Sequence, residues 1–235
     1  MPTAPSLDAD FKAVSTVSNS PTDFPTLAAI LLAAGSSRRY GADNKLLAEI
    51  DGAPLILRAA QALTSTLFHE IIIVTGHDAE LVSRAVRPLG TTMLFVHNPQ
   101  FNDGMGRSIA VGVAALSANV DGVLIAQADM PDVDTSLVAA LCQRFLAAGR
   151  DVITVPWIAS DGASGGRQGN PVIWPRRLFP DLAALSGDQG GKALIQAEGD
   201  AVERVIIHDS SAATDIDTPA QLAAYAEANC RNSRG

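Results

Sequence analysis

The sequence has little of what marks secreted or membrane-bound proteins. Only two of its 235 residues are cysteines, Cys142 and Cys230, and they stand in no C-x-x-C or metal-ligand spacing. We expect two idle thiols in a reducing compartment, because small secreted proteins build disulfide frameworks from many more cysteines. The N-terminus lacks the basic and apolar regions of a secretory signal, and no apolar run approaches the about 18 residues that span a bilayer. We therefore expect a cytoplasmic protein that binds no membrane.

Positive charge is also scarce. The chain has 17 Lys and Arg against 25 Asp and Glu, a net charge of −8, and a calculated isoelectric point near 4.9. Proteins that bind nucleic acids neutralise phosphates with clustered Lys and Arg, so this composition excludes a general nucleic-acid binder. Any anion-binding site must therefore be local.

Two familiar nucleotide-binding motifs are missing as well. Residues 35–41 read GSSRRYG, which has neither the spacing nor the composition of the G-x-G-x-x-G dinucleotide fingerprint. Residues 187–193 read GDQGGKA, which fails as a P-loop because the spacing is wrong and no Ser or Thr follows the lysine. An oxidoreductase with a Rossmann-like sheet is accordingly disfavoured.

The sequence does contain a regular alternation of apolar strands and amphipathic helices. Residues 1–25, rich in Ser, Thr, Pro and Asp, predict a disordered extension, and residues 26–230 predict a single domain. The expected strands are 27–33, 70–75, 92–96, 122–126, 151–155, 172–174 and 202–207, and the expected helices are 54–66, 78–87, 106–117, 135–147, 176–184, 189–197 and one starting at Thr218-Pro219. This order predicts a three-layer α/β fold with a mostly parallel, Rossmann-like sheet.

Ligands of such sheets lie beyond the carboxyl ends of the strands. The first strand ends in Ala33-Ala34-Gly35, where small residues allow a tight turn whose backbone amides face a ligand. Arg39 and Lys45 follow and supply cationic side chains. A phosphate-binding loop is the preferred interpretation, and an ordinary basic surface loop is the alternative.

Carboxylates that could hold Mg²⁺ follow other strands. Asp129 comes directly after the strand 122–126, and Asp215 and Asp217 precede the last helix. One or two carboxylates are the usual protein ligands of Mg²⁺ in phosphate-binding sites. The alternatives are that Asp129 shapes a turn and that Asp217 caps the helix. Gly104-Met105-Gly106 opens a further helix and could hold a phosphate, a ribose or a base edge.

These motifs together resemble a known family. The pattern L-A-A-G-x-S-x-R-x-G-x-x-N-K-L-L at 32–47 is similar to that of nucleotidyltransferases related to the molybdenum cofactor guanylyl- and cytidylyltransferases. The resemblance runs from about residue 27 to 228. The double alanine before Gly35, with T-G-H at 75–77, G-M-G-x-S at 104–108 and G-D-Q-G at 187–190, is more similar to the cytidylyl branch. Tyr40 and Gly191-Lys192 depart from the family pattern.

The resemblance implies a fold of the nucleotidyltransferase, or nucleotide-diphospho-sugar transferase-like, type. It also implies Mg²⁺-dependent transfer of CMP from CTP to the phosphate of molybdenum-molybdopterin, forming molybdopterin cytosine dinucleotide and pyrophosphate. A molybdenum hydroxylase or its chaperone is a recipient that this reading allows. The implied nucleotide-binding residues are Leu32, Ala33, Ala34, Gly35, Arg39, Lys45, Thr75, Gly76, Ser108 and Ala128; Arg39, Lys45 and Asp129 are catalytic, Asp129 and Asp217 bind metal, and Gly169, Asn170 and Pro171 bind the acceptor.

Other functions remain open at this point. A related transferase could use another NTP, or a sugar or polyol phosphate as acceptor. A non-catalytic carrier of a nucleotide or pterin cofactor could have the same fold, because fold does not determine function. The combination of Arg39, Lys45 and two separated aspartates favours an enzyme, since a carrier needs no metal pair at the α-phosphate.

Overall fold

A computed structural model of the chain describes residues 26–41, 43–64, 68–90, 93–159, 165–188, 190–208 and 214–232. The strands are β1 (Leu27–Ala33), β2 (Glu49–Ile50), β3 (Ala53–Pro54), β4 (Glu70–Thr75), β5 (Leu94–His97), β6 (Gly122–Gln127), β7 (Thr154–Ala159), β8 (Gly166–Gln168), β9 (Val172–Pro175) and β10 (Glu203–Ile207). The α-helices are α1 (Leu55–Thr64), α2 (Ala79–Val86), α3 (Met105–Ala114), α4 (Thr135–Ala147), α5 (Phe179–Ala183), α6 (Lys192–Glu198) and α7 (Pro219–Asn232). Short 3₁₀ helices are η1 (Lys45–Leu47), η2 (Arg87–Leu89), η3 (Phe101–Asp103), η4 (Arg176–Leu178) and η5 (Gly199–Ala201).

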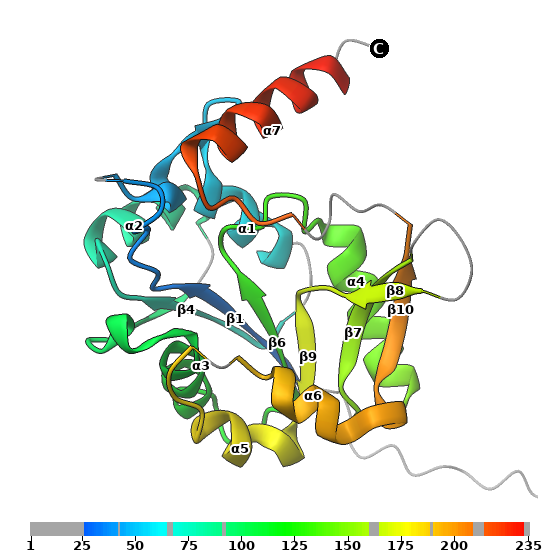
Figure 1. Ribbon diagram of the computed structural model, residues 1–235. Coiled ribbons are helices and arrows are strands. Elements are labelled where there is room, and N and C mark those ends of the chain that lie inside the picture. The colour runs from blue at the N-terminus through cyan, green and yellow to red at the C-terminus, as the bar shows by residue number, and fades with distance from the viewer. Residues whose placement is uncertain are drawn as a thin grey trace, which may run out of the picture.

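One mixed sheet organises these elements (Figure 1). Its strand order is β10-β7-β9-β6-β1-β4-β5, and β8 pairs with β7. β1 pairs in parallel with both β4 and β6, whereas β9 runs antiparallel between β6 and β7. The carboxyl ends of β1, β4, β5 and β6 therefore meet at one edge. The reversed β9 begins at that same edge, because Val172 pairs with Ile125.

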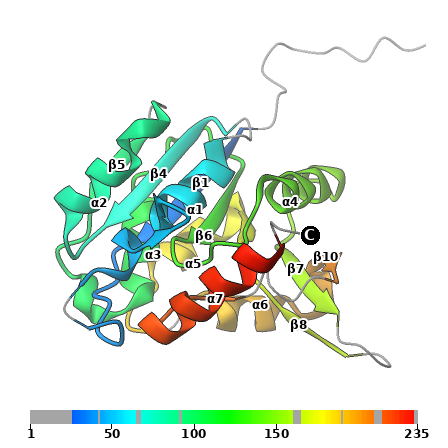
Figure 2. The same cartoon turned by 90° about the horizontal axis from the view of Figure 1, so that it is seen from above.

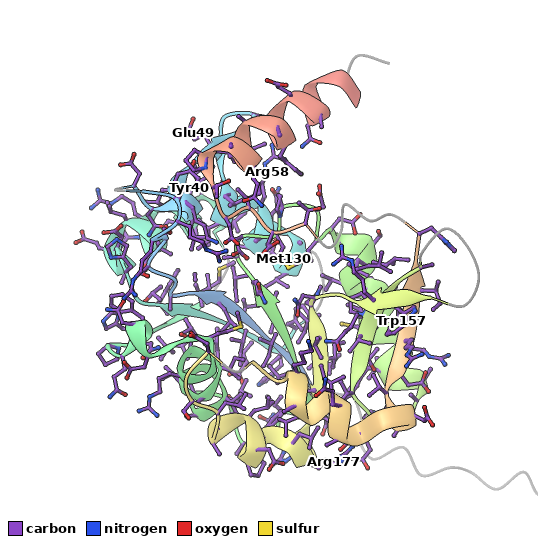
Figure 3. All side chains as sticks on the ribbon, viewed as in Figure 1. Tyr40, Glu49, Arg58, Met130, Trp157 and Arg177 are labelled. Carbon is purple, nitrogen blue, oxygen red and sulfur yellow. The ribbon has the colours of Figure 1, made fainter. Side chains whose placement is uncertain are left out.

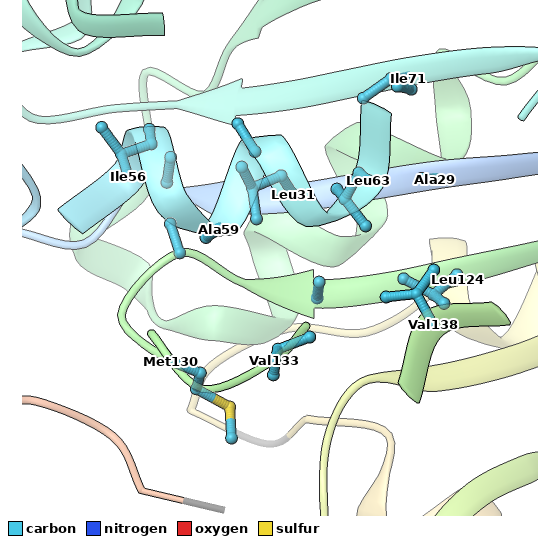
Figure 4. Close-up of a cluster of buried hydrophobic side chains, with 14 of the residues drawn as sticks. Ala29, Leu31, Ile56, Ala59, Leu63, Ile71, Leu124, Met130, Val133 and Val138 are labelled. Carbon is cyan, nitrogen blue, oxygen red and sulfur yellow. The ribbon is translucent and has the colours of Figure 1, made fainter. Parts of the chain in front are cut away.

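Helices cover both faces of the sheet, with α1, α2 and α4 on one face and α3, α5 and α6 on the other (Figures 1 and 2). Alternate residues of β1 enter different cores. Ala29 and Leu31 pack beneath α1 and α4 (Figure 4), while Ala28 and Ile30 pack against α3 and α5. Because side chains of a strand alternate between faces, a strand covered on both sides needs apolar residues at every position. This accounts for the uninterrupted apolar run and confirms the expected three-layer, mostly parallel, Rossmann-like fold.

Several boundaries agree with the sequence and one differs clearly. The strands predicted at 27–33 and 70–75 are β1 and β4. The strand predicted at 151–155 instead runs from Thr154 to Ala159. Gly149 and Arg150 adopt positive φ angles of 86° and 67° after α4, and this turn returns the chain to the sheet only at Thr154. Residues 157–159, expected in a connection, are therefore part of β7.

Two helix starts follow their expected caps. The Asp134 carboxylate accepts a hydrogen bond from the backbone N–H of Leu137 at 2.8 Å, and the Thr218 hydroxyl accepts one from Gln221 at 3.2 Å. Among the described helices, none has the length and apolar composition needed to cross a bilayer. The extension predicted at 1–25 lies outside the described residues, and the single-domain boundary stays a prediction.

Candidate functional site

A cavity of about 410 Å³ lies at the carboxyl edge of the sheet. The segment Ala34–Arg39 after β1 forms one wall, and residues of η3 and α3 form another. Lys45, Asp129 and Asp217 complete it from three segments that are far apart in the sequence. Figure 3 labels Met130, the neighbour of Asp129, at the end of β6. The carboxyl edge of the sheet, where the sequence predicts the functional residues, therefore contains a cavity.

A compact charged cluster lies in this cavity. The Lys45 ammonium is 2.7 Å from Oδ2 of Asp129 and 2.8 Å from Oδ1 of Asp217. The Arg39 guanidinium contacts the other oxygen of Asp217 at 2.8 Å. The side chains of Lys45, Asp129 and Asp217 are only 12%, 17% and 14% exposed, whereas that of Arg39 is 75% exposed. Three of the four charges are thus largely withdrawn from water.

Burial and the carboxylates act on Lys45 in opposite directions. Burial alone would lower the pKa of its ammonium, because it disfavours the charged form. The charge and hydrogen bonds of Asp129, joined by those of Asp217, outweigh burial and raise the Lys45 pKa above its ordinary value. Lys45 therefore carries a positive charge at neutral pH in this cluster.

Local backbone contacts hold Lys45 in place. The Asn44 side chain accepts a hydrogen bond from the backbone N–H of Leu46 at 3.0 Å and so caps η1. The backbone N–H of Lys45 donates to the Ser37 hydroxyl at 3.1 Å. These two contacts tie the lysine to the loop that follows β1. In the sequence, the signals for these two contacts were Ser37 and Asn44, which flank Arg38 and Arg39.

Asp217 reaches the cluster through a buried anchor. The backbone N–H of Ile216 donates to the carbonyl of Asp129 at 3.0 Å, and the Ile216 side chain is fully buried. Asp217 then faces Lys45, while Asp215 is exposed. Of the two aspartates left open by the sequence, Asp217 is the one that lies in the site.

The predicted nucleotide-binding residues divide into two layers. Six of them line the cavity, namely Leu32, Ala34, Gly35, Arg39, Lys45 and Ser108. A Cβ atom added to Gly35 would meet no atom within 4 Å, so this loop leaves open space on that side. The other four, Ala33, Thr75, Gly76 and Ala128, lie behind the wall rather than in it.

These four residues are buried behind the loop. Ala33, Thr75 and Ala128 are at most 2% exposed. A Cβ atom on Gly76 would lie 2.6 Å from the Ala34 carbonyl oxygen, so only glycine allows the β4 turn to pack so closely behind the β1 loop.

The glycines before α3 have a different role from the one the sequence suggested. Gly104 has a φ of +102°, and an added Cβ would clash with the backbone of Gly187. The backbone N–H of Gly106 donates to the Gly187 carbonyl at 2.9 Å. These glycines therefore pack two loops together, and the Gly106 amide is not available to a ligand. The contact places Asp188, which the sequence interpretation missed, in the cavity lining.

A second cavity of about 410 Å³ adjoins the first and shares Leu32, Met105 and Gln127 with it. Asn170 lines this second cavity, but Gly169 and Pro171 do not. Among the described residues that line it, Arg167 and Lys192 are the charged ones, and an apolar wall includes Trp174. Gly191 packs so closely on Trp174 that a Cβ atom would clash with the ring.

Comparison with known proteins places this chain in a family. Residues 29–203 match the family described as MobA-like NTP transferase domain. The chain belongs to this family. Its nucleotidyltransferase fold is therefore that of a MobA-like NTP transferase.

Relatives of this MobA-like NTP transferase extend over most of its length. It is 29% identical to nicotine blue oxidoreductase of Paenarthrobacter nicotinovorans, over 86% of this chain and 97% of the relative. It is also 29% identical to the purine catabolism protein PucB of Bacillus subtilis (strain 168), over 83% of this chain and 93% of the relative. A solved nucleotidyl transferase from Methanothermobacter thermautotroptrophicus superposes with a TM-score of 0.71 at 23% identity, over 88% of this chain and 99% of that one.

Proposed function

We propose that this MobA-like NTP transferase transfers CMP from CTP to the terminal phosphate of molybdenum-molybdopterin. The observation that carries the proposal is the Lys45 ammonium held between Asp129 and Asp217 in a cavity rimmed by Arg39 and the Gly35 loop. Such an arrangement offers cationic groups for a triphosphate and a carboxylate pair for a divalent ion at one point. The choice of CTP rests on the similarity of the motifs to those of the cytidylyl branch.

The residues present fit Mg²⁺. Asp129 and Asp217 already converge on one cation, the Lys45 ammonium. The second oxygen of Asp129, Oδ1, is buried and accepts no hydrogen bond within the part of the chain that the structure describes. That part contains no group of three or more acidic, His or Cys side chains suited to a metal, so Mg²⁺ would need phosphate oxygens beside the two carboxylates. Bound Mg²⁺ would polarise the α-phosphoryl group.

The chain's own residues would position the reactants and neutralise charge. The Gly35 loop and Arg39 would bind the phosphates, because exposed amides and a guanidinium suit their oxygens. An oxygen of the acceptor phosphate forms a bond to the α-phosphorus while the bond to the bridging oxygen breaks, and its electron pair leaves with pyrophosphate. Lys45 and Arg39 would stabilise the charge that accumulates on this leaving group.

The second cavity suits the acceptor. It adjoins the first across Met105 and Gln127, so a ligand there can reach the α-phosphate. Its apolar wall and the cations Arg167 and Lys192 fit a flat heterocycle that carries anionic groups. Within the described residues neither cation forms a hydrogen bond or ion pair, so both are available to a ligand.

The test measures pyrophosphate release by the full chain with Mg²⁺, molybdenum-loaded molybdopterin and each of the four NTPs. We expect the highest turnover with CTP. Asp129→Asn and Lys45→Ala should each lower kcat by about 10² or more, the scale of losing one preorganised electrostatic contact. Arg84→Ala, which removes an exposed charge on α2 outside both cavities, is the matched control. Absence of pyrophosphate with every NTP, or normal turnover in both site variants, contradicts the proposal.

An oxidoreductase is the second candidate, because the relative named nicotine blue oxidoreductase aligns over nearly its whole length. The charged cluster argues against it, since hydride transfer needs no carboxylate pair beside a lysine. Anaerobic incubation with NADH or NADPH and a quinonoid dye distinguishes the two. Nicotinamide oxidation without pyrophosphate release would favour the oxidoreductase, and the reverse would favour the transferase.

A further inference from the structure

A buried asparagine lies behind the wall of the first cavity. Asn98 follows β5 and is fully buried. Its backbone N–H donates to the Thr75 carbonyl at 2.7 Å. Its side-chain Oδ1 accepts from the backbone N–H of Gln100 at 3.0 Å, and its Nδ2 donates to the Ser108 hydroxyl at 3.0 Å. Both the oxygen and the nitrogen of its side-chain amide therefore form hydrogen bonds within the protein.

These contacts fix which way the amide points. A backbone N–H can only donate, so the Asn98 atom that faces Gln100 must be the oxygen. The NH₂ group must then face Ser108. Exchanging the amide oxygen and nitrogen would set two donors against each other at Gln100. The direction of the bond to Ser108 is thus determined by the network and not by an arbitrary choice of orientation.

The hydroxyl hydrogen of Ser108 is therefore left without an acceptor among the described residues. Its oxygen accepts from Asn98, and no group in the described part of the chain accepts from its hydroxyl. Ser108 is 5% exposed and lines the cavity from the first turn of α3, and the apolar residues Leu32 and Phe101 line the same cavity. A buried hydroxyl with an unused proton needs an acceptor, which a bound ligand can supply.

We propose that Asn98 is a positioning residue for the nucleobase: by donating to Ser108, which the family resemblance already implies as a nucleotide contact, it leaves the Ser108 hydroxyl to donate to an acceptor atom of the base. The inference rests on the proposed function only in placing a nucleotide in this cavity. Phe101 of η3 and Met105 of α3, the helix that also carries Ser108, line the cavity and suit a base, whereas the cations that suit phosphates are Arg38, Arg39 and Lys45 after β1. A base that presents a carbonyl oxygen or unprotonated ring nitrogen at this point is favoured over one that presents an amino group.

The test measures equilibrium binding of CTP, UTP, ATP and GTP to the full chain by calorimetry, without acceptor so that no turnover occurs. Ser108→Ala should weaken binding of the preferred nucleotide about tenfold or more and reduce the differences between bases, because a buried acceptor on the base loses its donor. Asn98→Asp should also change the base order, although the hydroxyl remains. The new carboxylate would accept from both Gln100 and Ser108, so that Ser108 offers only lone pairs to the cavity.

The two substitutions act on one hydrogen bond, so the double variant should show less than the product of the single effects on base preference. Ser83→Ala is the matched control, since the Ser83 hydroxyl donates within α2 to the Ala79 carbonyl and lies outside the cavity. Its base preference should equal that of the unaltered chain. Ser108→Ala removes a single oxygen atom and should fold. It therefore decides the test even if Asn98→Asp does not fold.

The outcomes separate this inference from the proposed function. Binding with unchanged ratios between the bases in Ser108→Ala, or in a folded Asn98→Asp, overturns the inference and leaves the transferase proposal standing. Absence of binding of all four nucleotides to the unaltered chain overturns both. A base preference that shifts in both single variants, but not in Ser83→Ala, supports the assignment.

Discussion

The side chain of Lys45 is nearly enclosed and touches two carboxylates, so removing its charge alters the site in a defined way. Lys45→Met keeps the length of the side chain but leaves Asp129 without a counter-charge and Asp217 paired only with the exposed Arg39. We expect this variant to lose roughly 3 kcal/mol of stability, because breaking a largely buried ion pair leaves uncompensated charge. Millimolar Mg²⁺ should restore part of it by taking the place of the ammonium.

Thermal unfolding with and without Mg²⁺ measures this exchange. At ten times its dissociation constant Mg²⁺ would return about 1.4 kcal/mol to the Lys45→Met variant, and it should change the original chain less, because there the ammonium competes. Arg84→Met, which breaks an exposed pair with Glu80, should show no response to Mg²⁺. Equal Mg²⁺ responses in the original chain and Lys45→Met would contradict this account of the site.

The residues of the charged cluster were predictable as neighbours because they stand in continuous motifs. Arg39 and Lys45 follow a buried strand in a glycine-containing loop, and Asp129 follows another. Asn98 and Asp188 were not predictable as site residues. Asn98 acts only through a hydrogen bond to a serine on another element, and Asp188 reaches the cavity only because Gly104 packs against Gly187. Such roles depend on tertiary contacts that no local pattern encodes.

Among the secondary-structure elements, α7 has the most direct link to the site, because it begins immediately after Asp217. The Tyr225 hydroxyl donates to the Asp132 carboxylate and so ties α7 to the loop that carries Asp129. Figure 3 labels Arg58 beneath this helix. Leu222 and Tyr225 also pack against the core, while α7 extends beyond the rest of the molecule (Figure 1).

Tyr225→Phe should therefore loosen α7 and with it Asp217. A hydrogen bond to a charged group contributes about 1.5 kcal/mol or more, so hydrogen exchange of the α7 amides should accelerate. If Asp217 binds Mg²⁺ as proposed, the Mg²⁺ concentration that half-saturates the transferase should rise several-fold, because this carboxylate is less well placed. Asp132→Ala breaks the same contact and should add little in the double variant. Faster exchange with unchanged Mg²⁺ dependence would mean that α7 does not position Asp217.

At the same scale, the predictability of each element followed its hydrophobic pattern. β1 and β4 are continuous apolar runs buried on both faces, which few other structures explain. β2, β3 and β8 have two or three residues each, too few for any periodicity to appear. The start of β7 was misplaced because Val152 and Ile153 are apolar although they lie in the turn after α4. The reversal of β9 depends on pairing with β6, which its own residues do not specify.

Considered as a whole, the molecule is stabilised by two cores on opposite faces of the sheet, and one of them encloses a thiol. Cys142 on α4 is 6% exposed, and burial raises the pKa of this thiol from 9.0 to about 11. Burial and the hydrogen bond to Asp132 likewise raise the pKa of Tyr225 from 10.0 to about 12. Both groups are neutral in the fold, and both lose their protons earlier in the unfolded chain.

Stability should consequently fall in alkaline solution. Below pH 9 the Cys142 thiol is protonated in both states and contributes no pH dependence. Between pH 9 and 11 the unfolded chain binds fewer protons than the folded one, so the free energy of unfolding declines as the pH rises. For Cys142 the loss between pH 8 and pH 10 is roughly 1.3 kcal/mol, from the 1.36 kcal/mol that accompanies each pKa unit. Tyr225 adds a further decline between pH 10 and 12.

Urea unfolding at pH 8 and pH 10, with a reductant present throughout, tests this argument. Cys142→Ala should be less stable than the original chain at both pH values, because a packed sulfur is removed. From pH 8 to pH 10, however, its free energy of unfolding should fall by about 1.3 kcal/mol less than that of the original chain. Tyr225→Phe should change the same difference much less, since its effect begins only near pH 10. An identical pH 8 to pH 10 difference in Cys142→Ala and the original chain would show that the thiol is not sheltered by the core, and the packing of α4 against the sheet would need revision.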